Sequence, residues 1–164
     1  MSNVHFIYWD ANVFIKYLEA DPNCIDTLEA ILDDVARSKG KKKIITSVLA
    51  KVEVAFLAHE RTKGLDSTSE AKIDLLWNDP NVIVTSEVHN GIVLKARQCM
   101  RYSFSQGWTG LRSADAIHLA SAAWLQVKEV HSYEPKWKRY STWINCPIIE
   151  PIVSQARMPI SSLI

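Results

Sequence analysis

The order of hydrophobic segments along the chain predicts an α/β protein with a central, mostly parallel sheet of four or five strands. Short runs rich in β-branched and aromatic residues alternate with longer stretches in which apolar residues recur every three or four positions. This alternation is typical of a parallel sheet covered by helices. With 164 residues, 48% of them hydrophobic, the chain is long enough for one buried core. No repeat, linker or low-complexity segment divides it.

The first half of the chain is predicted to form two strands and three helices. In order these are a strand over 4–9, helices over 13–19 and 22–37, a strand over 43–47 and a helix over 48–61. The strands are short apolar runs, and the helix over 22–37 has apolar residues at helical spacing. Asn12 and Pro22 are residue types that open helices, so each is expected to start one.

The second half predicts further strands and helices in the same alternation. They are a helix that Ser67 or Thr68 caps and that ends before 78, a strand over 82–85, helices over 87–105 and 111–126, a strand over 129–132, a helical or irregular segment over 137–143, and a weak fifth strand over 147–149. Loops rich in Asn, Asp, Gly and Pro separate these elements, as expected of connections between strands and helices.

Four carboxylates stand at the predicted ends of these elements: Asp10, Glu53, Asp115 and Glu134. Asp10 and Glu134 follow strands, whereas Glu53 and Asp115 lie in the first or second turn of helices that should begin at the same sheet edge. Ligands of open parallel sheets bind beyond the carboxyl ends of the strands. A carboxylate among apolar neighbours is costly to bury unless it is paired or binds a cation. The pattern therefore predicts a divalent-metal site and metal-assisted phosphodiester hydrolysis.

Each of these acids also has an ordinary structural explanation. Asp10 suits a helix cap, Glu53 a solvent-facing position, Asp115 a helix N-terminus and Glu134 a solvated loop. His118 is a metal ligand, a proton carrier or a hydrogen-bonded structural residue. Nearby polar side chains either support the carboxylates or cap turns and helices; they are Asn12, Ser47, Ser113 and Ser132.

The charge balance excludes a protein that coats nucleic acid through overall basicity. Lys and Arg number 19 against 18 Asp and Glu, for a net charge of +1. Any basic surface must therefore be local. The candidates for contacts with RNA are Arg112, beside Asp115, and the run Lys41-Lys42-Lys43, which also fits a solvated loop before a strand.

Cysteine spacing and hydropathy predict a cytoplasmic protein without a membrane segment. The three cysteines lie far apart, so neither a disulfide framework nor a zinc site is supported, and reduced thiols are expected. Residues 1–5 lack a basic leader followed by an apolar stretch, so we expect no signal peptide. No apolar run approaches the roughly 18 residues that a membrane span needs.

Four ordered segments resemble the motifs of PIN-domain ribonucleases, and most of all the VapC-type toxins of prokaryotic toxin–antitoxin pairs. They are Asp10-Ala11-Asn12-Val13-Phe14, residues 47–53, residues 114–120 around Asp115, and Ser132-Tyr133-Glu134. The resemblance covers residues 4–150. It implies a PIN-like three-layer sandwich over 1–150, with 151–164 as a C-terminal tail packed on the same domain.

The resemblance also implies an activity and partners. It implies an endoribonuclease dependent on Mg²⁺ or Mn²⁺, the toxin of a type II toxin–antitoxin system, with Asp10, Glu53 and Asp115 as core acidic residues and metal ligands. Glu134 takes the fourth acidic place, where the family usually has Asp after a Thr-x pattern; here the pattern is Ser132-x-Glu134. An RNA substrate, a cognate antitoxin and a homodimer are further implications of the family.

Three other interpretations fit parts of the pattern. A catalytically inactive PIN-like RNA-binding or scaffold protein would account for the unusual Glu134. An aspartyl-phosphate enzyme of the haloacid-dehalogenase type would use Asp10 as its nucleophile, but that chemistry wants a second Asp where Asn12 stands. A purely structural origin requires four unrelated caps to fall in family order by chance. The metal-dependent ribonuclease is therefore the function we expect.

Overall fold

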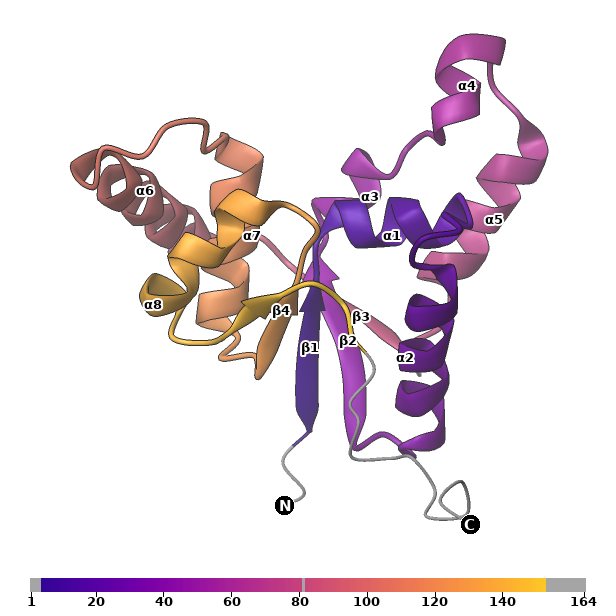
Figure 1. Ribbon diagram of the computed structural model, residues 1–164, viewed down its shortest axis with the longest axis horizontal. Helices are drawn as coiled ribbons and strands as arrows, with labels where there is room; N and C mark the ends of the chain where they lie inside the picture. The colour runs from indigo at the N-terminus through magenta and orange to yellow at the C-terminus, as the bar shows by residue number, and fades with distance from the viewer. Residues whose placement is uncertain (1–3, 81, 153–164) are drawn as a thin grey trace.

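The computed structural model describes residues 4–80 and 82–152, so most of the predicted C-terminal tail lies outside the described residues. Within them, the chain forms a five-stranded parallel sheet in the order β3-β2-β1-β4-β5 (Figure 1). The strands are β1 (His5–Trp9), β2 (Lys42–Ser47), β3 (Ile83–Ser86), β4 (Glu129–His131) and β5 (Ile148–Ile149). The predicted α/β class and the weak fifth strand are confirmed.

The helices of the first half of the chain lie on one side of the sheet, and those that cover its face contribute Phe14, Leu28 and Leu76 to the core. The helices of this half are α1 (Ala11–Leu18), α2 (Ile25–Arg37), α3 (Ala50–Glu53), α4 (Ala58–Lys63) and α5 (Ser67–Trp77). Ile7 and Trp9 of β1 point to this side and pack with Phe14, Leu28 and other buried residues of the first four elements. The arrangement follows from period-two alternation along the strand.

The opposite face is covered by the second half of the chain. Its helices are α6 (Asn90–Ser105), α7 (Ser113–Trp124), the 3₁₀ helix η1 (Pro135–Tyr140) and α8 (Ser141–Ile144). Tyr8, between Ile7 and Trp9 in β1, points to this side and packs with Leu119, Trp137 and neighbouring core residues. The sheet is thus buried on both faces, as parallel sheets are.

The prediction of one continuous helix over 48–61 was wrong. The segment forms two short helices, α3 and α4, and residues 54–57 lie between them. The buried Glu60 carboxylate explains the second start, because Oε2 accepts the backbone N–H of Leu57 and Oε1 accepts that of Asp66. Glu60 therefore holds the backbone on both sides of α4. Hydrophobic periodicity does not reveal this role.

Three predicted helix starts were also displaced. Asp10, and not Asn12, is the N-cap of α1, since its side chain accepts the Val13 N–H. Pro22 lies in a turn before α2, which begins at Ile25. The cap of α5 is the side chain of Asp66, which accepts the N–H of Thr68. Short polar side chains compete for neighbouring N-cap positions, so sequence alone places a cap only within a few residues.

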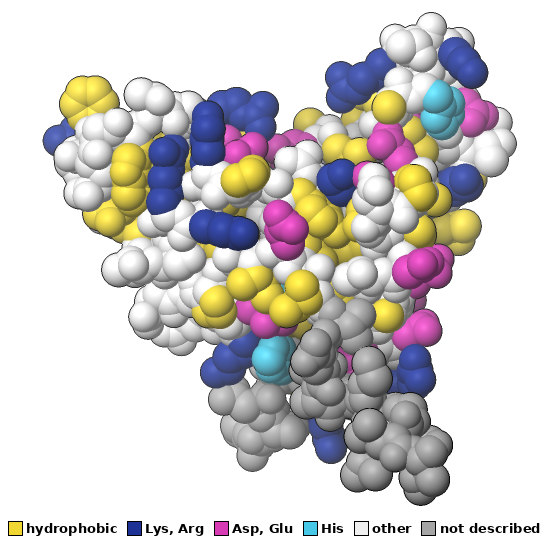
Figure 2. Space-filling model, in the orientation of Figure 1, with side chains coloured by type: hydrophobic (Ala, Val, Ile, Leu, Met, Phe, Trp, Pro, Cys, Tyr) yellow, Lys and Arg dark blue, Asp and Glu magenta, His cyan; other side chains and the backbone are white. Residues whose placement is uncertain are grey.

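The carboxyl ends of the strands face a notch between two arms of the molecule, which the space-filling view shows (Figure 2). Figure 1 shows α4 and α5 extending on one side of this notch and α6, α7 and α8 on the other, with α1 and α3 at its base. Residues that follow β1 and β4 therefore emerge at the bottom of the notch. No helix within the described ranges is both long and apolar enough to cross a lipid bilayer.

Replacing Leu28 by alanine tests the packing of α2 on the sheet. Leu28 is 0% exposed, so Leu28→Ala should lower the free energy of unfolding by about 2–5 kcal/mol. Leu75 of α5, which is 73% exposed, provides the matched control. Leu75→Ala should change the free energy of unfolding by less than about 0.5 kcal/mol. Urea unfolding followed by circular dichroism measures both. Equal effects of the two substitutions would contradict this packing.

Candidate functional site

Asp10 is buried where the ends of β1 and β4 meet. Its side chain follows β1, is 3% exposed, and accepts the Val13 N–H through Oδ1 over 3.0 Å. The Ser132 hydroxyl, just after β4, donates to Oδ2 over 2.5 Å, and the same hydroxyl oxygen accepts the backbone N–H of Glu134 over 3.1 Å. The predicted supporting role of Ser132 therefore has a geometric basis, since it joins two of the four acidic residues.

Burial raises the pKa of Asp10, and the hydrogen bonds from Ser132 and Val13 oppose that rise. The nearby charge of Glu53 raises the same pKa further, whereas His118 lowers it. Glu53 and His118, which come from α3 and α7, therefore lie within electrostatic range of a carboxylate at the end of β1. A second negative charge at this point favours a neutral Asp10 or a bound cation.

Glu53 is held by a buried histidine. His118 is 2% exposed, and its Nε2 lies 2.5 Å from Glu53 Oε2 while its Nδ1 lies 2.7 Å from the Tyr8 hydroxyl. That hydroxyl oxygen accepts the backbone N–H of Ser47, so the Tyr8 proton is available for Nδ1. His118 then donates from Nε2 to Glu53. Because protein groups occupy both ring nitrogens, the structure favours the hydrogen-bonded interpretation of His118 over the metal-ligand one.

Asp115 is the third residue of α7 and is paired with Arg112. The backbone N–H and Nε of Arg112 lie 3.2 and 3.3 Å from Asp115 Oδ2, and Nη2 lies 3.5 Å from Oδ1. The side chain of Asp115 is 15% exposed and that of Arg112 is 77% exposed. Asp115 raises the pKa of Arg112 most, and the charges of Glu53 and Glu134 raise it further. Arg112 thus lies among three of the four predicted acids.

A pocket of about 320 Å³ opens beside these groups, and we call it the acidic pocket. Its lining includes Asn12, Asp115 and Glu134, together with Arg112, Lys136 and Arg139. Asp10 and Glu53 do not line it; Asp10 is linked to the lining residue Glu134 through Ser132. A larger groove of about 580 Å³ between α2 and α5 contains none of the predicted site residues.

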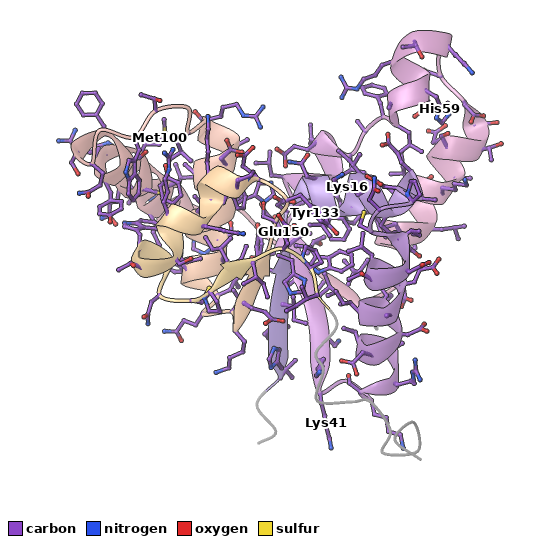
Figure 3. The ribbon with its side chains drawn as sticks, in the orientation of Figure 1. Lys16, Lys41, His59, Met100, Tyr133 and Glu150 are labelled. Carbon is purple, nitrogen blue, oxygen red and sulfur yellow. The ribbon has the colours of Figure 1, made fainter. Side chains whose placement is uncertain are left out.

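Several predicted residues do not join the acidic pocket. The Ser47 hydroxyl accepts the Leu49 N–H and caps a turn, and Ser113 is an exposed residue at the start of α7. Lys41, Lys42 and Lys43 lie at the amino end of β2, whereas the acids lie at the carboxyl ends of the strands. Figure 3 shows Lys41 at the opposite end of the sheet from Tyr133, which precedes Glu134. This lysine run therefore does not line the acidic pocket, and its contact with RNA stays a prediction.

Two cations in the pocket lining were missed by the sequence analysis. Lys136 and Arg139 belong to η1, which begins directly after its N-cap Glu134. The run Lys136-Trp137-Lys138-Arg139 combines basic and aromatic residues beside a predicted site residue, and that local signal could have indicated them.

The four acids have the donor chemistry of a Mg²⁺ or Mn²⁺ site, because both ions prefer carboxylate oxygens. In the part of the chain that the structure describes, however, no three His, Cys, Asp or Glu side chains lie close enough together to hold an ion. Two of the carboxylates already have partners, since Arg112 is bonded to Asp115 and His118 to Glu53. The exposed Arg112 side chain is the group whose movement would release Asp115 for a metal.

A family model described as the PIN domain matches residues 7–142, which include Asp10, Glu53, Asp115 and Glu134. The chain belongs to the PIN-domain family. A search of curated protein sequences finds no match.

Solved structures similar to this PIN domain come from two-component bacterial assemblies. VapBC2 from Rickettsia felis, bound to a promoter DNA fragment, matches with a TM-score of 0.67 and 13% identity. FitAcB from Neisseria gonorrhoeae matches with a TM-score of 0.60 and 17% identity. VapBC-1 from nontypeable Haemophilus influenzae matches with a TM-score of 0.61 and 15% identity. Each comparison covers 88% of this chain and 97% of the other. At these identities the likeness shows a shared fold.

Removing the Tyr8 hydroxyl tests the chain of hydrogen bonds that reaches Glu53. Tyr8→Phe leaves the buried Ser47 N–H without its acceptor and His118 Nδ1 without its donor. It should lower the free energy of unfolding by about 1–3 kcal/mol. Tyr17→Phe, at a partly buried tyrosine of α1, is the control and should have little effect. Denaturant unfolding at pH 7 measures both, and equal stabilities of Tyr8→Phe and the parent protein would refute this hydrogen-bond chain.

The raised pKa of Asp10 predicts a stability change with a definite sign. An acid whose pKa is higher in the folded than in the unfolded state destabilises the fold at neutral pH, and the penalty disappears as pH falls through the folded pKa. Asp10→Asn removes this penalty, so its stability relative to the parent should be greatest near pH 7 and decline towards acid. Urea unfolding in chelator from pH 7 to pH 4 measures the difference, with Asp26→Asn, in the exposed first turn of α2, as control. A relative stability that rises towards acid would contradict the prediction.

Proposed function

We propose that this PIN domain is a metal-dependent endoribonuclease and the toxin of a type II toxin–antitoxin pair. The observation that carries the proposal is that four acidic residues from four parts of the chain lie around the carboxyl edge of the sheet and are linked by hydrogen bonds or by charge, although no three carboxylates of the described residues are close enough to hold an ion without some movement. Asp10 is joined through Ser132 to the segment of Glu134. Glu53 acts electrostatically on Asp10, and Asp115, Glu53 and Glu134 all act on Arg112. The PIN-domain match supports nuclease chemistry at these residues.

Asp10, Asp115, Glu53 and Glu134 are the residues that would hold Mg²⁺ or Mn²⁺. Such an ion offsets phosphate charge and makes bound water more acidic. The protein contributes orientation: Val13 and Ser132 fix the two oxygens of Asp10, and His118 fixes Glu53. Such fixed carboxylates do not need to reorganise during the reaction.

Arg112 is the residue we propose to exchange partners when RNA binds. Its guanidinium is mostly exposed and bonded to Asp115. A guanidinium group matches the geometry of a phosphate as well as that of a carboxylate. Movement of Arg112 towards RNA would therefore free Asp115 and place a positive charge beside the phosphodiester. The expected products have 5′-phosphate and 3′-hydroxyl ends.

A cognate antitoxin is the proposed protein partner. The similar solved structures belong to VapBC and FitAB assemblies, which supports a second component for this chain as well. The groove of about 580 Å³ beside α5, with the exposed side chain of Leu75 at its border, offers apolar surface for a protein contact. A homodimer acting in the cytoplasm completes the proposal.

A catalytically inactive PIN-like RNA-binding or scaffold protein is the second candidate. It is favoured by the pairing of Asp115 with Arg112 and by the separation of the acids among the described residues. The two candidates differ in whether metal binds and RNA is cut.

The deciding measurement is RNA cleavage by the purified chain, free of any partner, with Mg²⁺ or Mn²⁺ and with chelator. Asp10→Asn and Asp115→Asn should each reduce cleavage by roughly 100-fold or more, as expected when a group that stabilises developing charge is lost. Asp26→Asn, which removes an exposed carboxylate from α2, should cleave like the parent.

Each alternative has its own result in this assay. Equal cleavage by parent, Asp10→Asn and Asp115→Asn would identify a contaminating nuclease. Absence of cleavage, together with absence of metal binding by calorimetry, would reject the enzyme and favour the scaffold.

A further inference from the structure

The acidic pocket has a cationic side that the four carboxylates do not neutralise. Lys136 and Arg139 both line the pocket, on the helix that follows Glu134. Within residues 4–80 and 82–152, neither forms an ion pair with a carboxylate. Arg112, the third cation of the lining, differs because it is already bonded to Asp115. Two cations in the pocket are thus available for an external anion.

Arg139 is held in place by aromatic rings and one carbonyl group. Its guanidinium carbon lies 5.0 Å from the centre of the Trp108 ring and 5.4 Å from that of Tyr140. Nη2 donates to the Thr109 carbonyl over 3.0 Å, whereas Nε has no acceptor among the described residues. Stacking fixes the plane of the guanidinium without using all of its N–H groups. Because Nε is buried, a phosphate oxygen would be bound through the terminal N–H groups of this held guanidinium.

Lys136 supplies the second charge at the rim. Its side chain is exposed and lies beside the backbone of Gly110, where an added Cβ would come 3.6 Å from Nζ. Gly110 has φ 87°, a conformation that side-chain-bearing residues rarely adopt, so glycine suits this position in the loop before α7. Figure 2 shows Lys and Arg side chains gathered on the arm formed by α6, α7 and α8, close to acidic side chains at the notch.

We propose that Lys136 and Arg139 form a phosphate subsite that holds a backbone phosphate of single-stranded RNA next to the acidic residues. The identity of the ligand as RNA rests on the proposed function, whereas the anion subsite rests on the geometry of the pocket. The pocket is small and concave, so a phosphate must enter from a strand that can bend into it, which favours an unpaired strand over a duplex. A phosphate held here would position the neighbouring phosphodiester beside Asp115 and Glu134.

Binding of RNA without cleavage tests the subsite. A labelled, unstructured RNA oligonucleotide is titrated with the parent protein in chelator, which prevents metal-dependent cleavage, at several salt concentrations. Adding Lys136→Gln or Arg139→Gln should weaken binding and reduce the slope of log K against log salt by about 0.7 for each lost phosphate contact. Lys41→Gln removes the same charge at the opposite end of the sheet and should change neither quantity.

A conservative variant separates charge from geometry. Arg139→Lys should keep the salt slope of the parent protein but bind RNA more weakly, because it retains the charge and loses the planar fork. Thermal melting of each variant checks folding. Should Arg139→Gln lose its fold through the lost stacking on Trp108, the exposed Lys136→Gln still decides the question.

The outcomes distinguish this proposal from the proposed nuclease. Lys136→Gln and Arg139→Gln binding RNA as tightly as Lys41→Gln would overturn the subsite, even if the parent chain cuts RNA. Binding that depends on both residues would support the subsite, even if the parent chain never cuts RNA. A perfect duplex bound as tightly as the single strand would overturn the preference for unpaired RNA. Tighter binding of an acidic peptide than of RNA, with the same dependence on both residues, would assign the subsite to a protein partner and overturn the RNA proposal.

Discussion

The burial of one carboxylate, that of Asp10, constrains the rest of the site. A buried carboxylate needs donors or a cation, and Asp10 obtains its donors from the start of α1 and from Ser132 after β4. These bonds tie the ends of two adjacent strands to one point. Because Ser132 also accepts the N–H of Glu134, the position of η1 and of its cations depends on the same carboxylate. The acidic pocket is therefore built outward from Asp10.

A second set of hydrogen bonds passes through the opposite layer of the sandwich. Tyr8 leaves β1 on the face opposite its neighbours Ile7 and Trp9, and there it meets His118 of α7, which holds Glu53. Adjacent residues of β1 thus support different acids: Tyr8 reaches Glu53 through His118, while Asp10 binds Ser132. Because successive side chains of a strand point to opposite faces of the sheet, one short strand can support both of these acids.

The site combines opposite charges in a way that suits a nucleic-acid substrate. The pocket is lined by the carboxylates of Asp115 and Glu134 and by cations from the loop before α7 and from η1, which are the proposed phosphate-binding groups. The Arg112–Asp115 pair connects the two kinds of charge, because its dissociation would expose one group of each kind. The Arg112 side chain of this pair is 77% exposed, and an ion pair open to solvent contributes little to stability, so Arg112 can exchange partners at low cost.

Hydrophobic periodicity and residue order by themselves determined the α/β class, the order of strands and helices, and the location of the four acids near one sheet edge. These features follow from local patterning and from the rule that parallel strands end at the same edge. The break after α3 escaped prediction because it depends on the burial of Glu60. Only the tertiary structure brings His118 into contact with Tyr8, 110 positions away, and with Glu53, 65 positions away. Contacts at such separations arise from the packing of whole layers, which no local pattern encodes.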